Sequence, residues 1–293
     1  MDLELKGKRA LVTGGSRGIG KAIALALAQE GVQVALLARD AGALSSAAAE
    51  IAQSTGRKVA AISADTTSDA QVQRAVADAQ QQLGGGIDIL VNAAAEPAGF
   101  AAPPKLGEIT TDYFHAEMDT KVMGYIRCAR EVAAGMRTRG WGRIVNISGL
   151  AARQSGSAVG SIRNVAVAAL TKNLADELGP AGINVTVVHP GLTRTERTAP
   201  LVQARAIALG VSPTEVEAQM AAGNSINHLV DASEVAHVVV FLCSPKSRAI
   251  NGDACRRRWR RAAQHPLLSL RALAGTRLPA GDKRRFWRCT RSM

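Results

Sequence analysis

The chain has 293 residues and a mass of 30.5 kDa, enough for one large α/β domain or two small ones without disulfides or a structural metal. Its 47% hydrophobic and 20% charged residues exclude a chain that is disordered throughout. The net charge of +12 is unevenly distributed: residues 255–293 hold twelve of the 36 basic residues and a single acid, which leaves 24 basic against 23 acidic residues in 1–254. We therefore predict one nearly neutral domain over 1–254 and an arginine-rich, disordered tail over 255–293. The charge gives no reason to expect that the domain binds nucleic acid.

The cysteines and the N-terminus indicate where the protein resides. Cys128 and Cys243 lie in the domain and Cys255 and Cys289 in the tail, without metal-ligand spacing, which favours a reducing compartment and no metal site. The first six residues carry acids where a signal peptide carries bases, and the longest apolar runs are too short to span a membrane. We expect a cytoplasmic protein without a membrane partner.

Short apolar runs alternate with Ala-rich segments of helical period along the domain. We predict strands at 9–13, 33–38, 59–63, 87–92, 143–148 and 184–189, a short seventh strand at 249–253, and helices near 18–30, 41–55, 69–83, 110–138, 158–178 and 231–243. Strands that are apolar on both faces and separated by helices form a parallel sheet covered on both sides. The pattern predicts an α/β fold of three layers, a doubly wound parallel sheet of the Rossmann type.

Two stretches, 96–107 and 191–230, interrupt this alternation, and each follows the carboxyl end of a predicted strand. Ligands of open α/β sheets bind at that edge, so we expect these stretches to form the walls of a substrate cleft. Two ordinary long connections are the alternative.

A glycine-rich loop, Thr-Gly-Gly-Ser-Arg-Gly-Ile-Gly at 13–20, follows the first predicted strand and opens the first predicted helix. Glycines at such a place let the chain turn tightly and let a pyrophosphate approach backbone N–H groups at the positive end of a helix. The loop therefore predicts a dinucleotide site, with a tight turn that binds no ligand as the alternative.

A set of motifs in unbroken order over residues 1 to 253 resembles the short-chain dehydrogenase/reductases. The motifs are Thr-Gly-x-x-x-Gly-x-Gly at 13–20, Asp65 after the third strand, Asn-Ala-Ala-Ala at 92–95, Asn-Ile-Ser at 146–148 and Pro-Gly-x-x-x-Thr at 190–195. The resemblance implies that Asp65 bonds the adenine, Asn92 supports the adenine ribose side and Thr195 holds the nicotinamide carboxamide. The expected cofactor-binding residues are Gly14, Ser16, Arg17, Gly18, Ile19, Gly20, Arg39, Asp65, Asn92, Pro190, Gly191 and Thr195.

The choice of cofactor follows from charge at the end of the second strand. An NAD enzyme places an acid there to bind the ribose 2′-hydroxyl, whereas a 2′-phosphate requires cations. Ala38 stands where the acid is expected, and Arg39 and Arg17 supply positive charge. Asp40 lies at the distance from the loop typical of the ribose-binding acid, but we interpret it as the N-cap of the following helix. We expect NADP(H) rather than NAD(H).

The catalytic motif of the family is absent. The resemblance implies hydride transfer with a tyrosine as acid or base, a lysine four residues later, a serine and an asparagine. Gly160 stands at the tyrosine position, Asn164 at the lysine, Gly149 at the serine and Lys121 at the asparagine. The only tyrosines, Tyr113 and Tyr125, lie upstream on another predicted element. The catalytic residues are therefore unknown from the sequence.

Substitute groups can be named among the polar residues nearby. Lys121 is the best candidate acid, since burial would lower the pKa of its amine toward neutrality, and Ser148 could polarise a carbonyl. Arg163, His115 and His189 are weaker candidates. Each also has an ordinary structural interpretation, as a solvated charge, a strand-end hydroxyl or a half-buried ring. No Gly-x-Ser-x-Gly elbow supports a hydrolase.

In the family that this chain resembles, the last strand usually ends in two glycines. The tail of this chain begins at that position. Here Ile-Asn-Gly-Asp-Ala at 250–254 is followed by Cys-Arg-Arg-Arg-Trp. We hypothesise that a frameshift produced residues 255–293; the alternative is a basic arm for phosphate backbones or anionic lipid. The altered last strand puts the homo-oligomer expected of the family in doubt.

Two functions of different classes remain open. One is an oxidoreductase acting on a small carbonyl or alcohol through a rearranged catalytic set. The other is a non-catalytic NADP(H)-binding sensor or partner subunit.

Overall fold

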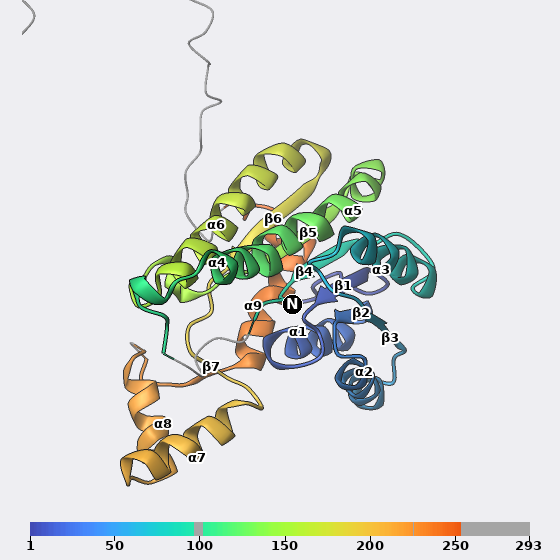
Figure 1. Ribbon diagram of the computed structural model, residues 1–293. Coiled ribbons are helices and arrows are strands. Elements are labelled where there is room, and N and C mark those ends of the chain that lie inside the picture. The colour runs from blue at the N-terminus through green and yellow to red at the C-terminus, as the bar shows by residue number, and fades with distance from the viewer. Residues whose placement is uncertain (97–101, 225, 253–293) are drawn as a thin grey trace, which may run out of the picture. The chain divides into compact units, whose positions relative to one another are not determined.

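Six apolar runs form one parallel sheet in the computed structural model, which describes residues 1–96, 102–224 and 226–252 (Figure 1). The strands are β1 (Arg9–Thr13), β2 (Gln33–Ala38), β3 (Val59–Ser63), β4 (Ile89–Asn92), β5 (Gly142–Ile147) and β6 (Ile183–Val188), in the order β3-β2-β1-β4-β5-β6. From β1 the chain adds β2 and β3 on one side of the sheet and then β4, β5 and β6 on the other, so the order of strand addition reverses between β1 and β4. A ligand cleft is expected beyond the carboxyl ends of these two strands. The predicted doubly wound sheet is confirmed.

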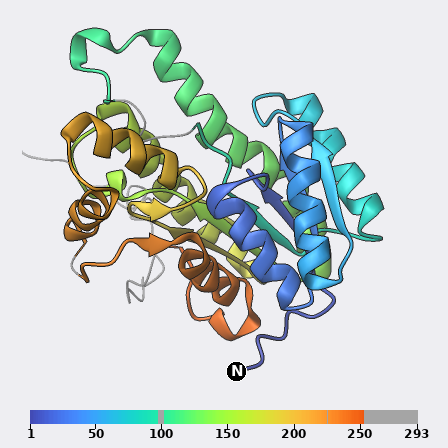
Figure 2. The same ribbon diagram turned by 90° about the horizontal axis from the view of Figure 1, so that it is seen from below.

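Helices cover both faces of this sheet. They are α1 (Gly18–Gln29), α2 (Ala41–Thr55), α3 (Asp69–Gln82), α4 (Thr111–Met118), α5 (Gly124–Arg139), α6 (Ala158–Leu178), α7 (Thr198–Leu209), α8 (Pro213–Ala222) and α9 (Ala232–Cys243). Residues of α1, α2 and α9 share one buried apolar cluster with the sheet, and residues of α3, α5 and α6 share another. In Figure 2 the blue α1 lies beside the orange α9 on the first face. This gives the three layers that the strand pattern predicts.

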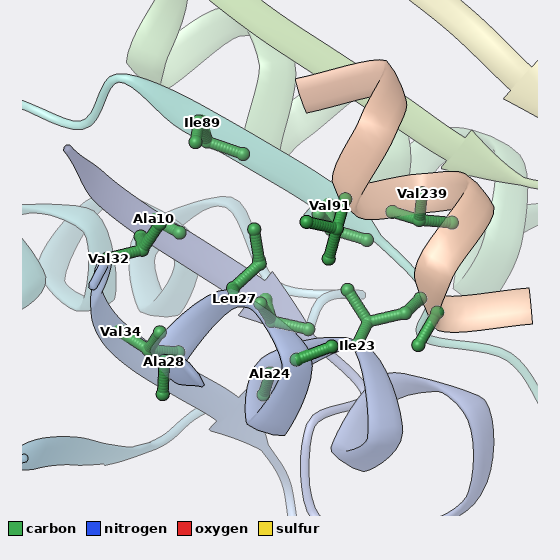
Figure 3. Packing of buried hydrophobic residues seen from close by; sticks show 14 of the residues in the cluster. Ala10, Ile23, Ala24, Leu27, Ala28, Val32, Val34, Ile89, Val91 and Val239 are labelled. Carbon is green, nitrogen blue, oxygen red and sulfur yellow. The ribbon is translucent and has the colours of Figure 1, made fainter. Parts of the chain in front are cut away.

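The core between α1, α9 and the sheet consists of small aliphatic side chains. Ile23 and Leu27 are one helical turn apart on α1 and are fully buried against Val91 of β4 and Val239 of α9 (Figure 3). Alanines such as Ala24 on the same helix add little bulk, so the helix backbone lies close to the strands. The low aromatic content of the sequence matches this packing.

The predicted helix over 110–138 is divided in the structure. A π-helical turn, Asp119–Met123, separates α4 from α5. The apolar pattern is continuous across this turn and does not reveal it, because the extra residue of a π-turn is absorbed without a break in the helix. Such turns occur often at functional sites.

The predicted seventh strand at 249–253 does not form over residues 249–252. The Gly252 N–H donates to the Val185 carbonyl of β6 at 2.9 Å, as a paired strand would begin. However, the Asn251 side chain accepts the Val185 N–H at 2.8 Å. A side chain thus takes the place of a backbone partner, which corrects the prediction for the described part of this segment.

Residues 191–230 contain more regular structure than the sequence suggests. The strand β7 (Thr193–Arg194) pairs with β8 (Val230–Asp231) in a small parallel sheet apart from the main one. Between them α7 and α8, orange in Figure 1, pack on each other through Val202 and Ala206 of α7 and Val216 and Met220 of α8, and Leu229 belongs to the same buried cluster.

The tail predictions, disorder, frameshift and a basic arm over 255–293, lie outside the described residues. Within the described residues, no helix combines the length and apolar character needed to cross a membrane.

Candidate functional site

A cleft of about 670 Å³ opens at the carboxyl ends of the central strands. Most of the residues predicted from sequence line it: Gly14, Ser16, Arg17, Gly18, Ile19, Gly20, Arg39, Lys121, Ser148, Pro190, Gly191 and Thr195. Both long stretches contribute to its walls: the first gives Glu96, and the second gives Gly191, Leu192, Thr193, Thr195, Glu196, Arg197, Thr198, Leu201 and Met220. The cleft therefore joins the glycine-rich loop to the two catalytic candidates, Lys121 and Ser148.

The glycine-rich loop is packed too tightly for larger residues. A Cβ on Gly14, whose φ is +67°, would lie 2.8 Å from the Ala93 carbonyl oxygen, and a Cβ on Gly20 would lie 2.2 Å from the Gly14 oxygen. The loop passes directly into α1, whose first N–H groups have no partner within the helix. The observed backbone thus has the cradle that a pyrophosphate needs.

Thr13 fixes the geometry behind this cradle and was not singled out from the sequence. Its hydroxyl oxygen accepts the N–H groups of Ala93 and Ala94 at 3.1 and 3.2 Å, which ties the end of β1 to the chain after β4. A threonine at a strand end has many ordinary uses, so only the position next to the glycines could have signalled this role.

Two predicted cofactor residues do not line the cleft. Asn92 is fully buried and donates to the Asn146 side chain at 3.0 Å, and Asn146 donates to the Thr171 hydroxyl at 2.9 Å. Asp65 accepts the Thr67 N–H at 2.9 Å, while its neighbour Thr66 does line the cleft. Asn92 therefore lies behind the wall of the cleft, and Asp65 lies beside it.

The two arginines expected to bind a 2′-phosphate both line the cleft and both are paired with acids. Arg17 donates to Asp40 at 3.2 Å and Arg39 donates to Glu96 at 2.6 Å. Asp40 also accepts the Ala43 N–H at 3.0 Å, which confirms that it is the N-cap of α2.

Lys121 lies on the π-helical turn and extends into the cleft wall. Its side chain is buried, with the residue only 4% exposed, and its Nζ donates to the Ser148 carbonyl at 2.8 Å and to Asn164 Oδ1 at 3.0 Å. Burial lowers the pKa of the amine from 10.5 to about 8. An amine of this pKa can release a proton near neutral pH.

Asn164 and Gly149 form one packed unit with this amine. A Cβ on Gly149 would lie 2.9 Å from Asn164 Nδ2, so a serine there would require Asn164 to move. Ser148 donates its hydroxyl proton to the Asn164 backbone carbonyl at 3.0 Å, and that proton is therefore engaged with the helix. Of the two candidates, Lys121 has the better geometry for proton transfer.

No tyrosine lines the cleft among the described residues. Tyr125 is buried and donates its hydroxyl to the Ile147 carbonyl at 2.8 Å, and burial raises the pKa of its phenol. Tyr113 is an exposed residue of α4. Gly160 lies in the first turn of α6, where its N–H donates to the N-cap Ser157.

The weaker candidates do not line the cleft. Arg163 is buried in an ion pair with Glu117, and His115 is exposed on α4. His189 lines a second cavity of about 330 Å³, together with Leu150, Val238 and Phe241. None of the three is among the cleft residues.

His228, Asp231 and Glu234 form a group that could bind a metal ion, because their side-chain nitrogen and oxygen atoms lie within 4.8 Å of one another. Glu234 accepts the Asp231 N–H at 2.8 Å and contacts His228 at 2.9 Å, and Asp231 lies 3.6 Å from Arg194. These contacts cap α9 and join β8 to β7, which accounts for the group without a metal.

A dinucleotide fits the residues present. The glycine cradle is one that a Cβ would fill, the N-terminus of α1 opens into the cleft, and both arginines border it. The cleft volume lies within the range of about 300–1,000 Å³ typical of cofactor sites.

Comparisons with known proteins agree with this geometry. Residues 8–206 match the family model described as short chain dehydrogenase. The chain is 34% identical over 245 residues to the short-chain reductase protein NovJ of Streptomyces niveus, covering 83% of this chain and 90% of that one. It is 36% identical over 246 residues to an acetoacetyl-CoA reductase of Shinella zoogloeoides, covering 83% and 94%.

A solved structure shares the arrangement of the elements. The L-sorbose reductase of Gluconobacter frateurii, complexed with NADPH and L-sorbose, superimposes with a TM-score of 0.80 at 29% identity, covering 87% of this chain and 96% of that one. Fold, glycine-rich loop, cleft and relatives point the same way, and the chain belongs to the short-chain dehydrogenase family.

Proposed function

We propose that the chain is an NADP(H)-dependent oxidoreductase that interconverts a small carbonyl compound and its alcohol, with Lys121 exchanging the proton. The observation that carries the proposal is a buried amine of lowered pKa in the wall of the cleft that contains the glycine-rich loop. A cytoplasmic location belongs to the same proposal and is supported by the free thiols of Cys128 and Cys243.

The preference for NADP(H) is supported by charge. Arg17 and Arg39 border the cleft beside the end of β2, where Ala38 offers no carboxylate for a ribose hydroxyl. The similar L-sorbose reductase was solved with NADPH. When bound, the nicotinamide supplies or accepts the hydride.

Lys121 is suited to deliver the proton to the substrate oxygen in the direction of reduction. An N–H bond of the ammonium breaks, an O–H bond of the alcohol forms, and the neutral amine regains a proton from solvent. Asn164 and the Ser148 carbonyl hold the nitrogen in both protonation states, because each accepts an N–H. Oxidation of the alcohol runs through the same steps in reverse.

A second candidate is a protein that binds NADP(H) without turnover. The absence of a phenol from the cleft wall, within the described residues, favours it, as does the engagement of the Ser148 hydroxyl with α6. Lys121 would then serve only to tie the π-helical turn to Ser148 and Asn164.

Kinetics on the full chain separate the two candidates. NADPH oxidation is followed with a carbonyl panel that includes acetoacetyl-CoA and L-sorbose, and NADPH binding is measured by calorimetry. We expect Lys121→Met to lower kcat by about 100-fold or more with the NADPH Kd unchanged, since general acids contribute about 10²- to 10⁴-fold. Lys172→Met, at an exposed lysine of α6, is the matched control and leaves kcat unchanged.

The pH profile gives an independent test. Reduction needs the protonated amine, so kcat is expected to fall above about pH 8. Equal kcat for Lys121→Met and wild type would remove Lys121 from the mechanism. Tight NADPH binding without oxidation of NADPH by any compound of the panel would favour the non-catalytic candidate.

A further inference from the structure

Three carboxylates occupy the groups of the cleft that would recognise phosphate. Glu196 accepts the Gly18 N–H at 2.7 Å, at the first residue of α1. The other two acids are Asp40 on Arg17 and Glu96 on Arg39. All six residues line the same cleft.

The contact at α1 shows that this helix end attracts an anion. The N-terminal N–H groups of a helix carry partial positive charge and lack partners within the helix. The Glu196 carboxylate comes from a segment 178 residues away and satisfies one of them. A pyrophosphate bound at the same N–H groups would have to displace this side chain.

The segment that carries Glu196 has fixed points on both sides. Before it, β7 is held by its pairing with β8. After it, α7 begins at Thr198, whose hydroxyl accepts the Thr195 N–H at 2.9 Å. Glu196 lies between these points, so its side chain can leave the Gly18 N–H by rotation about its own bonds while the flanking elements stay in place.

The two arginine pairs are exposed and therefore weak. Side-chain exposures are 44% and 57% for Arg17 and Asp40, and 58% and 37% for Arg39 and Glu96. Exposed ion pairs contribute about 0–1 kcal/mol, so a phosphate can replace either acid. A carboxylate left beside a bound 2′-phosphate would nevertheless repel it.

We propose that Glu196 competes with the pyrophosphate of the dinucleotide for the N-terminus of α1, and that Asp40 and Glu96 compete with the 2′-phosphate for Arg17 and Arg39. Glu196 thereby sets the affinity for both dinucleotides, while Asp40 and Glu96 set the preference between NADP(H) and NAD(H). This inference rests on the proposed function, because it assumes that a dinucleotide binds in the cleft.

The test measures the Kd of NADPH and of NADH by calorimetry on the full chain at low ionic strength. Glu196→Gln is expected to lower both Kd values by about threefold to tenfold. Glu96→Gln and Asp40→Asn are expected to lower the Kd of NADPH by a similar factor and to leave that of NADH unchanged. Asparagine keeps a cap acceptor for α2, so the Asp40 variant retains the helix end.

Glu50→Gln is the matched control. Glu50 is an exposed acid of α2 that pairs with Lys21 and does not line the cleft, and its replacement changes the net charge by the same amount. Its Kd values should equal those of wild type for both dinucleotides. If Glu50→Gln gained as much affinity as Glu196→Gln, the effect would come from net charge alone, and the proposal would be overturned.

The remaining outcomes are distinct. If wild type binds NADPH and the cleft variants bind it no more tightly, the competition is overturned and the proposed function stands. If Glu196→Gln favours only one of the two dinucleotides, the assignment of Glu196 to the pyrophosphate is wrong. If neither wild type nor any variant binds NADPH or NADH, both the inference and the proposed function fail.

Discussion

Lys121 brings a buried amine to the cleft wall from the π-helical turn, whereas the family resemblance implies a lysine at position 164 on α6. Asn164 supplies the amide there, and the two side chains meet at 3.0 Å. The amine and the amide have in effect exchanged elements.

This burial makes folding stability depend on pH. Between about pH 8 and 10.5 the unfolded chain keeps a proton on Lys121 that the folded chain has released. The free energy of unfolding should therefore rise with pH in this window, by about 3 kcal/mol in total for this residue. Urea denaturation of wild type and Lys121→Met across the window measures it, as the difference between the two proteins. A difference that stays constant with pH would contradict the buried amine.

Gly14 and Gly56 allow conformational strain to be separated from steric obstruction. Their φ values are +67° and +66°, but only Gly14 has backbone within 4 Å of a Cβ position. Gly56→Ala should cost about 1 kcal/mol and leave NADPH affinity unchanged. Gly14→Ala should cost more and weaken NADPH binding at least about tenfold, because the Ala93 carbonyl must move. Thermal denaturation and calorimetry check both variants; equal affinity losses would show that the cradle does not bind the cofactor.

At the scale of elements, the packing of α1 against α9 and the sheet is the main source of order on one face. Leu27→Ala removes a fully buried side chain of that cluster and should lower the free energy of unfolding by about 2–5 kcal/mol. Leu209→Ala, at the end of α7 with 59% exposure, should change it by less than about 0.5 kcal/mol. Urea titration distinguishes them, and similar losses would place the critical packing elsewhere.

The element boundaries were predictable where the determinants are local. The strands β1, β2 and β3 and the helices α2 and α6 begin and end where the sequence predicts, and Asp40 is the N-cap of α2 as predicted. The π-helical turn was not predictable, because the apolar pattern continues through it and the partners of its Lys121 side chain, Ser148 and Asn164, lie far along the chain. The prediction of a last strand was wrong over 249–252 for a similar reason, since the Asn251 side chain bonds β6 in place of the backbone.

The candidate site also has parts that could be predicted from the sequence and parts that could not. The glycine-rich loop is a local motif, and its cradle could be derived from the glycines alone. The partners of Gly18 and Arg39 could not, because Glu196 and Glu96 come from segments 178 and 57 residues away. No pattern in the sequence marks these acids as neighbours of Gly18 and Arg39.

At the scale of the molecule, each face of the main sheet encloses one of the two thiols in the described part of the chain. Cys128 of α5 belongs to one core cluster and Cys243 of α9 to the other, and burial raises the pKa of both thiols to about 12. Neither is reactive while its face stays closed.

The labelling rates of these two thiols should therefore report separately on the opening of the two faces. In a Cys255→Ser/Cys289→Ser background, modification by a thiol reagent should be slow and limited by local unfolding, with Cys128 reporting on α5 and Cys243 on α9. Mass spectrometry of the two peptides gives the two rates. Leu27→Ala should speed labelling of Cys243 more than that of Cys128, unless the domain opens only as a whole, in which case both rates rise together.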